Sequence, residues 1–210
     1  DAAYARRILV LLAHPSLDRS EVNRPLAVAT ATVDGVTIVD LYAEYPGFDI
    51  DVDREQARLR EHDVIVFMHP LYWYSTPSIL KEWQDLVLEH DFAYGSKGTA
   101  LHGKIFLSAL SAGGPEAGYC AEGYNHFTIR ELLRPLEQMA ILCGMIYLPP
   151  FALFGARTAV DDFFADKPEM RCPTGPASVA FAHSSRNRRP TWTGGNTPSG
   201  APPMPTPSLR

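Results

Sequence analysis

The 210-residue sequence lacks the features of a membrane-spanning or disulfide-rich protein. Its longest apolar runs, residues 8–13 and 64–68, have the length of buried strands and are far too short to cross a bilayer. Residues 1–7 lack the charged-then-apolar layout of a signal peptide. The three cysteines are widely spaced and form no Cys-x-x-Cys pair, which argues against a disulfide framework or a zinc site. A reducing, cytoplasmic compartment fits this composition best.

The chain also lacks an excess of positive charge. Its net charge is −5 and its sequence pI is about 5.8, so nucleic acid is a poor candidate for the main partner. No two of the seven histidines stand at metal-ligand spacing, and no metal is expected. The fingerprints G-x-G-x-x-G and G-x-x-x-x-G-K-[ST] are missing after the first apolar run. A Rossmann dinucleotide site and a P-loop therefore lose their main sequence support.

The sequence does contain a regular alternation of short apolar and amphipathic segments. Strands are predicted over residues 8–13, 36–41, 64–68, 104–110 and 145–148, the last of them ended by Pro149 and Pro150. Helices are predicted over about 23–30, 53–62 and 131–143, the last with Gly144 as its C-cap. A further helix is predicted to follow Thr76 as its N-cap and Pro77 as its first residue.

This alternation predicts an α/β fold with a doubly wound, five-stranded parallel sheet. Ligands of such sheets bind beyond the carboxyl ends of the strands. The loops after the first, third and fourth strands are therefore the places to look for a site.

The end of the chain has a different composition. Beyond about Lys167 it holds nine prolines, the pair Gly194 and Gly195, and many Ser and Thr residues without an apolar period. Such a segment cannot bury a core and is typical of irregular structure. We therefore predict one domain over residues 1–166 and an irregular tail over residues 167–210.

The loop after the first strand, residues 14–23, is a candidate anion site. It leads into a predicted helix, whose first turn offers unpaired N–H groups and the positive end of the helix dipole. The side chains of His14, Ser20 and Asn23 would add donors for a phosphate or pyrophosphate. Capping of the helix by Ser20 or Asn23 alone explains two of these residues equally well.

The loop after the third strand carries three adjacent aromatic residues, Tyr72, Trp73 and Tyr74. Neighbouring side chains at a strand end point to opposite sides, so burial in the core does not explain all three. A flat ring with polar edges, such as the isoalloxazine of a flavin, would stack on them. The alternative is an exposed aromatic patch at a subunit interface, and the two interpretations are compatible.

The loop after the fourth strand begins with Ser-Ala-Gly-Gly at residues 111–114. Paired glycines let a backbone approach a ligand closely, although a simple turn is their commoner meaning. Tyr119, Tyr124 and His126 follow in a long stretch, where they would be able to donate hydrogen bonds to negative charge on a reduced flavin or a quinone oxygen. A surface position explains each of them equally well.

Together these motifs resemble the flavodoxin-like NAD(P)H:quinone oxidoreductases. The similarity is greatest to the bacterial branch that includes ancillary subunits of glutathione-gated potassium efflux systems. It covers residues 7–155 and rests on His14-Pro with Ser20 and Asn23, on the nine residues from His69 to Pro77, on Leu80-Lys-Glu-Trp83, on Ala100-Leu-His-Gly-Lys104 and on residues 111–114. The chain differs from these relatives in two places: residues 111–112 are Ser-Ala instead of two threonines, and a proline-rich tail stands in place of an amphipathic helix.

The resemblance implies a tightly bound flavin, FMN or FAD, with NADPH or NADH as hydride donor. It further implies a ping-pong, two-electron transfer of hydride to a quinone-type acceptor. The catalytic tyrosine and histidine of the family's quinone reductases lie roughly where Tyr119 and His126 stand here. The implied flavin-binding residues are His14, Ser20, Glu21, Val22, Asn23, Leu71, Tyr72, Trp73, Tyr74, Ser111, Ala112, Gly113 and Gly114.

The resemblance also implies a homodimer with the flavin near the interface, either cytoplasmic or peripheral to the inner face of the cell membrane. Two other functions stay open. One is a regulatory ancillary subunit docked on a potassium efflux channel, with secondary redox activity. The other is a one-electron flavodoxin-type carrier, against which stand the weak net charge and the lack of a Ser/Thr-rich phosphate loop.

Overall fold

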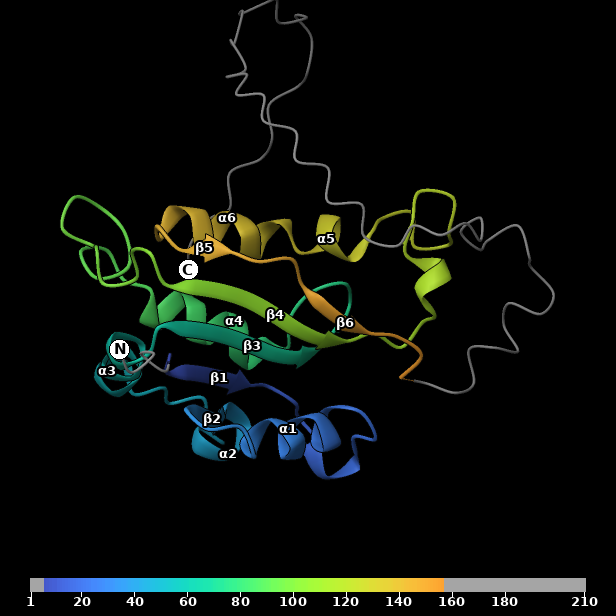
Figure 1. Cartoon of the computed structure of the whole chain (residues 1–210), viewed down its shortest axis with the longest axis horizontal. Helices are drawn as coiled ribbons and strands as arrows, with labels where there is room; N and C mark the ends of the chain where they lie inside the picture. The colour runs from blue at the N-terminus through green and yellow to red at the C-terminus, as the bar shows by residue number, and fades with distance from the viewer. Residues whose placement is uncertain (1–5, 157–210) are drawn as a thin grey trace, which may run out of the picture. The chain divides into compact units, whose positions relative to one another are not determined.

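The computed structural model describes residues 6–156, and Figure 1 shows how their elements are arranged. These residues belong to one compact unit of the chain. The boundary predicted near residue 166 and the proline-rich segment 167–210 lie outside the described residues.

A parallel sheet forms the centre of this unit (Figure 1). Its strands run in the order β2-β1-β3-β4-β5, and β6 also pairs with β4. The order changes direction between β1 and β3, which is where sheets of this kind bind ligands. The prediction of a doubly wound parallel sheet is confirmed. The strands are β1 (Ile8–Leu12), β2 (Val36–Asp40), β3 (Val64–Pro70), β4 (Ile105–Ser111), β5 (Ile146–Tyr147) and β6 (Phe151–Leu153).

The fifth position of the sheet is occupied by two short strands instead of the one predicted. β5 pairs with the start of β4, and β6 pairs with its end. β5 ends before Pro149 and Pro150, as predicted, but pairing with β4 resumes after them in β6, which was not predicted. In the described part of the chain β5 and β6 pair with β4 alone. They form an edge of the sheet, where the missing N–H of a proline is tolerated.

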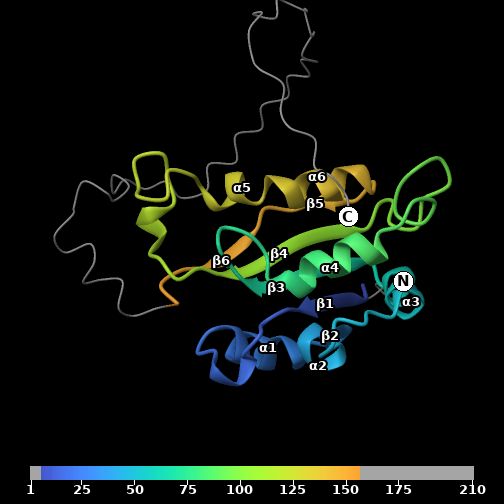
Figure 2. The same ribbon diagram turned by 180° about the vertical axis from the view of Figure 1, so that it is seen from behind.

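Helices cover both faces of the sheet. α1 packs through Leu26 and Ala27 on one face, whereas residues of α3, α4, α5 and α6 join the core on the other face. Figure 2 shows α4 crossing in front of β3 and β4. The helices are α1 (Asn23–Ala31), α2 (Leu41–Glu44), α3 (Val52–Glu61), α4 (Ser78–Val87), α5 (Ile129–Leu132) and α6 (Arg134–Leu142), with 3-10 turns η1 (Leu17–Arg19) and η2 (Glu116–Gly118).

Two predicted helix features were wrong in detail. Thr76 caps nothing, because Pro77 itself occupies the N-cap position of α4, with φ −56° and ψ 151°. The helix predicted over 131–143 is split at Leu133 into α5 and α6. Pro135 lies in the first turn of α6 and lacks the N–H that a continuous helix would need. Gly144, with φ +69°, follows α6 as predicted.

The described cysteines differ from one another. Cys143 is a free, buried thiol, and burial raises its pKa. Cys120 is disulfide-bonded, which the argument from cysteine spacing did not predict, because spacing along the chain does not report distance in space. Over residues 6–156 we find no helix with the length and apolar character needed to span a membrane.

Candidate active site

Two adjoining cavities lie at the carboxyl ends of β1, β3 and β4. Both are lined by the loops that follow these strands, and Leu71, Tyr72 and Gly113 line both of them. We call the cavity over the β1–α1 loop the polar cavity and the other the aromatic cavity. The topology explains their position, because the carboxyl ends of parallel strands meet at one edge of the sheet.

The polar cavity has a volume of about 570 Å³, and Asn23 ties its two sides together. The Asn23 Nδ2 donates to Ser111 Oγ at 2.8 Å, and the Asn23 backbone N–H donates to Ser20 Oγ at 2.9 Å. The N-cap position of α1 is occupied by Val22 without a side-chain cap, whereas Ser20 Oγ accepts from the first residue of the helix and also lines the cavity. The buried Asn23 Oδ1 has no partner among the described residues. An unpaired buried acceptor costs roughly 1–3 kcal/mol, which a ligand donor would offset.

Two basic side chains line the same cavity, His14 and Arg19. The Ser16 N–H donates to His14 Nδ1 at 3.1 Å, which leaves His14 Nε2 as the protonated nitrogen of the neutral ring. Burial lowers the pKa of His14, while Asp40 and Asp18 act in the opposite direction. Arg19 is exposed at the end of η1 and carries a fixed positive charge. With the start of α1, these groups can hold a phosphate.

The aromatic cavity has a volume of about 590 Å³ and is bordered by a tight turn at the start of the β3–α4 loop. Tyr72 and Ser75 exchange two backbone hydrogen bonds, each of 3.0 Å. The two residues between them, Trp73 and Tyr74, both have positive φ, at +48° and +62°. This is the geometry of a type I′ turn, which normally holds Asn-Gly.

A left-handed conformation costs an L-residue with a Cβ roughly 1–2 kcal/mol. In return for this cost, the turn holds two aromatic rings at the surface: Trp73 is 94% exposed, and Tyr74 is 47% exposed. Backbone strain of this kind gathers at ligand sites.

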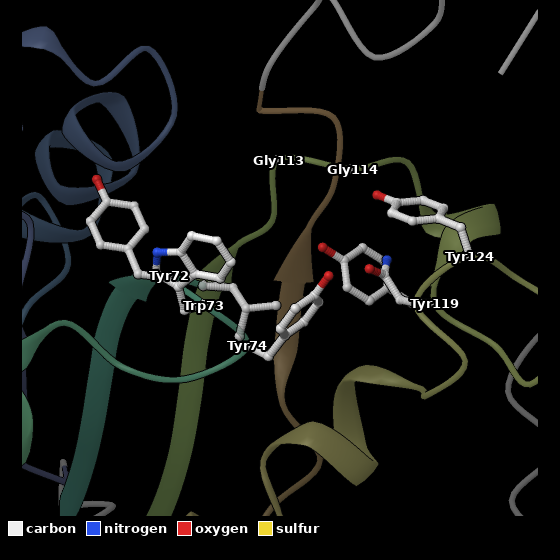
Figure 3. A pocket seen from close by; sticks show the side chains of 9 residues that line it. Tyr72, Trp73, Tyr74, Gly113, Gly114, Tyr119 and Tyr124 are labelled. Atoms are coloured by element: carbon white, nitrogen blue, oxygen red, sulfur yellow. The ribbon is translucent and has the colours of Figure 1, made fainter. Parts of the chain in front are cut away.

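The β4–α5 loop supplies the opposite wall of the aromatic cavity. Figure 3 shows the hydroxyl groups of Tyr74 and Tyr119 pointing toward one another across it. The Tyr124 ring lies against the backbone of Gly114 and Gly118, where an added Cβ would come within 2.1 Å and 2.3 Å of Tyr124 atoms. A side chain at either position would therefore displace the Tyr124 ring from its place beside the cavity.

The phenol of Tyr119 is held in its neutral form. Burial, with smaller contributions from Tyr124 and Tyr74, raises the pKa of Tyr119 to about 12, while a hydrogen bond with the Gly114 backbone acts in the opposite direction. Tyr119 is accordingly a hydrogen-bond donor at any physiological pH.

Comparison with known proteins identifies the family. A family model described as a flavodoxin-like fold matches residues 6–170. The chain belongs to this family. It resembles the glutathione-regulated potassium-efflux system ancillary protein KefG of Yersinia enterocolitica, with 43% identity over 190 residues, which are 90% of this chain and 97% of the relative.

Two solved structures of the same fold are also similar. The general stress protein 14 of Treponema denticola, in complex with FMN, has 39% identity and a TM-score of 0.70, covering 74% of this chain and 90% of that one. An NADPH-quinone reductase from P. pentosaceus has 32% identity and a TM-score of 0.64, covering 80% of this chain and 99% of that one.

The flavodoxin-like fold brings nearly all of the predicted flavin-binding residues to the two cavities. Every one of them except Ala112 lines at least one cavity, Glu21 and Val22 included. Ala112 is buried, and its N–H donates to the Leu153 carbonyl at 2.8 Å. Its backbone N–H therefore extends the pairing between β4 and β6 and is not available to a ligand.

The two predicted catalytic residues are separated. Tyr119 lines the aromatic cavity, whereas His126 is exposed, with φ +61°, and lines neither cavity. Among the lining residues that sequence reasoning missed are Arg19 and Asn125, which line the polar and the aromatic cavity respectively. A basic residue within a predicted anion loop was a usable signal for Arg19. Nothing in the sequence pattern singled out Asn125.

Proposed function

We propose that this chain is an FMN-dependent oxidoreductase that passes two electrons from NAD(P)H to a quinone-type acceptor. The observation that carries the proposal is the pair of adjoining cavities, one with phosphate-binding groups and the other with aromatic walls. FMN has the same division into a phosphate end and a flat ring. The names of the relatives, one an FMN complex and one an NADPH-quinone reductase, support it.

The residues present fit this cofactor. His14, Arg19 and Ser20 would hold the phosphate near the start of α1, and the unpaired Asn23 Oδ1 would accept from a ribityl hydroxyl. Gly113 lines both cavities without a side chain that would separate them, and Trp73 would flank the ring. FAD, which the sequence left open, is not supported by these relatives, since the flavin named among them is FMN.

FMN, when bound, would supply two-electron redox chemistry between NADPH or NADH and the acceptor, and the proposed order of the two substrates is ping-pong. The protein's part is to place the reactants and to supply protons. Tyr119 would hold a proton on its hydroxyl at the wall of the aromatic cavity, positioned to donate to an acceptor oxygen that gains negative charge. His126 would join in this role only if it came nearer to the cavity than it lies here.

An absorbance spectrum tests the proposal directly. The full chain, purified and reconstituted with FMN, should show a flavin band that NADPH or NADH bleaches under anaerobic conditions and that a quinone restores. A chain that takes up neither FMN nor FAD would refute it. If neither NADPH nor NADH bleaches the flavin band, the chain binds flavin but is not an NAD(P)H oxidoreductase.

A second candidate function is that of a regulatory subunit of a potassium efflux system. It is favoured by one observation, the 43% identity to KefG over 97% of that relative's length. One chain can have both functions. The proposed homodimer and the proposed position at the inner face of the membrane are compatible with either function. Pull-down with the cytoplasmic domain of such a channel tests the second candidate. The pull-down is repeated with flavin-free protein. Binding that persists without flavin shows that docking does not depend on redox activity.

A further inference from the structure

The aromatic cavity differs from the polar cavity in charge. Among the described residues its lining is made of tyrosines, a tryptophan, a leucine, two glycines and one asparagine, with no Lys, Arg, His, Asp or Glu. The polar cavity has His14, Arg19 and Glu21 in its wall. A charged ligand group that leaves water for the aromatic cavity would therefore find no opposite charge, and burying an unpaired charge is costly.

The same cavity has hydrogen-bond donors to offer. Figure 3 shows the hydroxyl groups of Tyr74 and Tyr119, from two different loops, turned toward the same part of the cavity. Asn125 stands beside them, only 7% exposed, and its Nδ2 has no hydrogen-bond partner in the described part of the chain. The Asn125 backbone N–H donates to the Gly118 carbonyl at 3.1 Å, which fixes the residue in the same loop that seats the Tyr124 ring.

A buried amide without a partner is unusual, because leaving it unpaired costs roughly 1–3 kcal/mol. Here it is found in the lining of a cavity that is otherwise aromatic. A ligand oxygen that accepted from Asn125 Nδ2 would remove this cost, and no structural role of Asn125 within the fold requires the unpaired donor.

We propose that Asn125 is a specificity-determining residue that donates a hydrogen bond to a carbonyl oxygen of the electron acceptor, in a cavity that selects uncharged aromatic acceptors over anionic ones. This inference rests on the proposed function and names the chemical class of its acceptor. The acceptor is a planar, neutral ring with carbonyl oxygens at its edge. His126, the neighbouring residue, is exposed and contributes nothing to this selection.

The test uses two probes with the same ring, 1,4-naphthoquinone and 1,4-naphthoquinone-2-sulfonate. Their binding to the full, FMN-loaded chain is measured by quenching of intrinsic fluorescence without NAD(P)H. We expect the neutral quinone to bind at least about tenfold more tightly than the sulfonate. Equal or tighter binding of the sulfonate would overturn the proposal. This measurement needs no turnover, so a chain that binds as expected but fails to reduce quinones refutes the proposed function alone.

Asn125→Leu removes the donor and keeps the side-chain size. We expect it to weaken binding of 1,4-naphthoquinone by about tenfold while FMN stays bound. Gln138→Leu, the same loss of a carboxamide on the exposed surface of α6, is the matched control and should bind as the wild type does. Wild-type affinity in a folded Asn125→Leu chain would contradict the role of Asn125. Should this variant not fold, the preference of the wild-type chain for the neutral probe still decides the proposal.

Discussion

The ionisation of His69 should be visible in the stability of the whole chain. His69 is fully buried, its Nδ1–H donates to the Pro70 carbonyl at 2.9 Å, and its Nε2 has no partner among the described residues. Burial lowers the pKa of His69 from 6.5 to about 4, although the hydrogen bond to Pro70 acts in the opposite direction. A second proton would have to bind at Nε2, where no acceptor lies among the described residues.

The unfolded chain binds this proton more tightly than the folded chain does. The contribution of neutral His69 to the free energy of unfolding is therefore fully present above pH 6.5 and is lost as the pH falls toward 4. The loss attributable to His69 is about 3 kcal/mol. Urea unfolding of the apo chain at pH 7.5 and pH 4.5 measures it. His69→Gln should reduce the difference between the two pH values, whereas His90→Gln, at an exposed position, should leave it unchanged. An identical pH dependence in His69→Gln would show that His69 does not titrate as described.

Trp73 should contribute to flavin retention through its ring. The side chain lines the aromatic cavity while remaining almost wholly exposed, so its removal disturbs little of the fold. Loss of an aromatic contact worth roughly 0.5–1.5 kcal/mol predicts that Trp73→Ala binds FMN about three- to tenfold more weakly. Titration followed by flavin fluorescence checks this. Phe127→Ala, which removes an exposed ring that lines neither cavity, is the control, and equal FMN affinity in both variants would exclude Trp73 from the site.

Tyr119 and His126 should differ in their effect on acceptor reduction. Tyr119→Phe removes the neutral donor from the cavity wall and should lower kcat for the quinone half-reaction by roughly 10²-fold, with FMN affinity little changed. His126→Ala should slow it much less, because His126 is exposed and lines neither cavity. Stopped-flow reoxidation of the reduced protein compares them. Wild-type reoxidation in His126→Ala would leave Tyr119 without its predicted partner.

At the level of elements, the strained turn after β3 should lower the stability of the fold while placing two aromatic rings at the proposed site. Replacing Trp73 and Tyr74 by Asn and Gly suits the type I′ geometry and should raise the free energy of unfolding of the apo chain by about 1–2 kcal/mol. FMN binding should weaken by more than in Trp73→Ala, because both rings are gone. Replacement by Ala-Ala removes the rings but keeps the strained backbone. If the Ala-Ala and Asn-Gly chains unfold at the same urea concentration, the turn is not strained.

The elements that the sequence predicted well are those with a strong local pattern. The strands β1 and β3 are continuous apolar runs because both faces of a parallel sheet are buried, and their bounds came out within two residues. The misses lie beside prolines. The helix predicted over 131–143 divides at Leu133, with Pro135 in the first turn of its second part, and pairing with β4 resumes in β6 after Pro149 and Pro150. Hydrophobic spacing does not report where a helix divides, and the return of the chain to β4 depends on where β4 lies in space.

The site was predictable to the level of its loops and less so to the level of residues. Fold topology brings the ends of β1, β3 and β4 together, so motifs in these loops identify the cavity. Which side chains of a long loop turn inward depends on its backbone. Asn125 and His126 are adjacent in sequence, yet Asn125 is buried at the cavity and His126 is exposed. Their backbone conformation, with a left-handed residue at His126, carries no periodic signal.

At the level of the whole molecule, the described lining of both cavities comes from the predicted domain. The described lining residues lie between His14 and Ala156, and every strand of the described sheet ends before Phe154. The predicted domain, residues 1–166, should therefore contain all that FMN binding needs. The segment 167–210 adds length with nine prolines and no apolar period.

A chain that ends at Asp166 should bind FMN with an affinity within about threefold of the full chain, and its flavin should be bleached by NADPH at the same rate. A difference of that size corresponds to less than about 1 kcal/mol. Sedimentation equilibrium of both chains, with and without FMN, adds the oligomeric state. The proposed homodimer should survive the truncation, since the exposed aromatic residues Tyr72, Trp73 and Tyr74 lie within the domain. If the shortened chain loses FMN but stays folded by circular dichroism, the tail contributes to the site. If it becomes monomeric and keeps FMN, the tail holds the dimer together and the cavities do not depend on it.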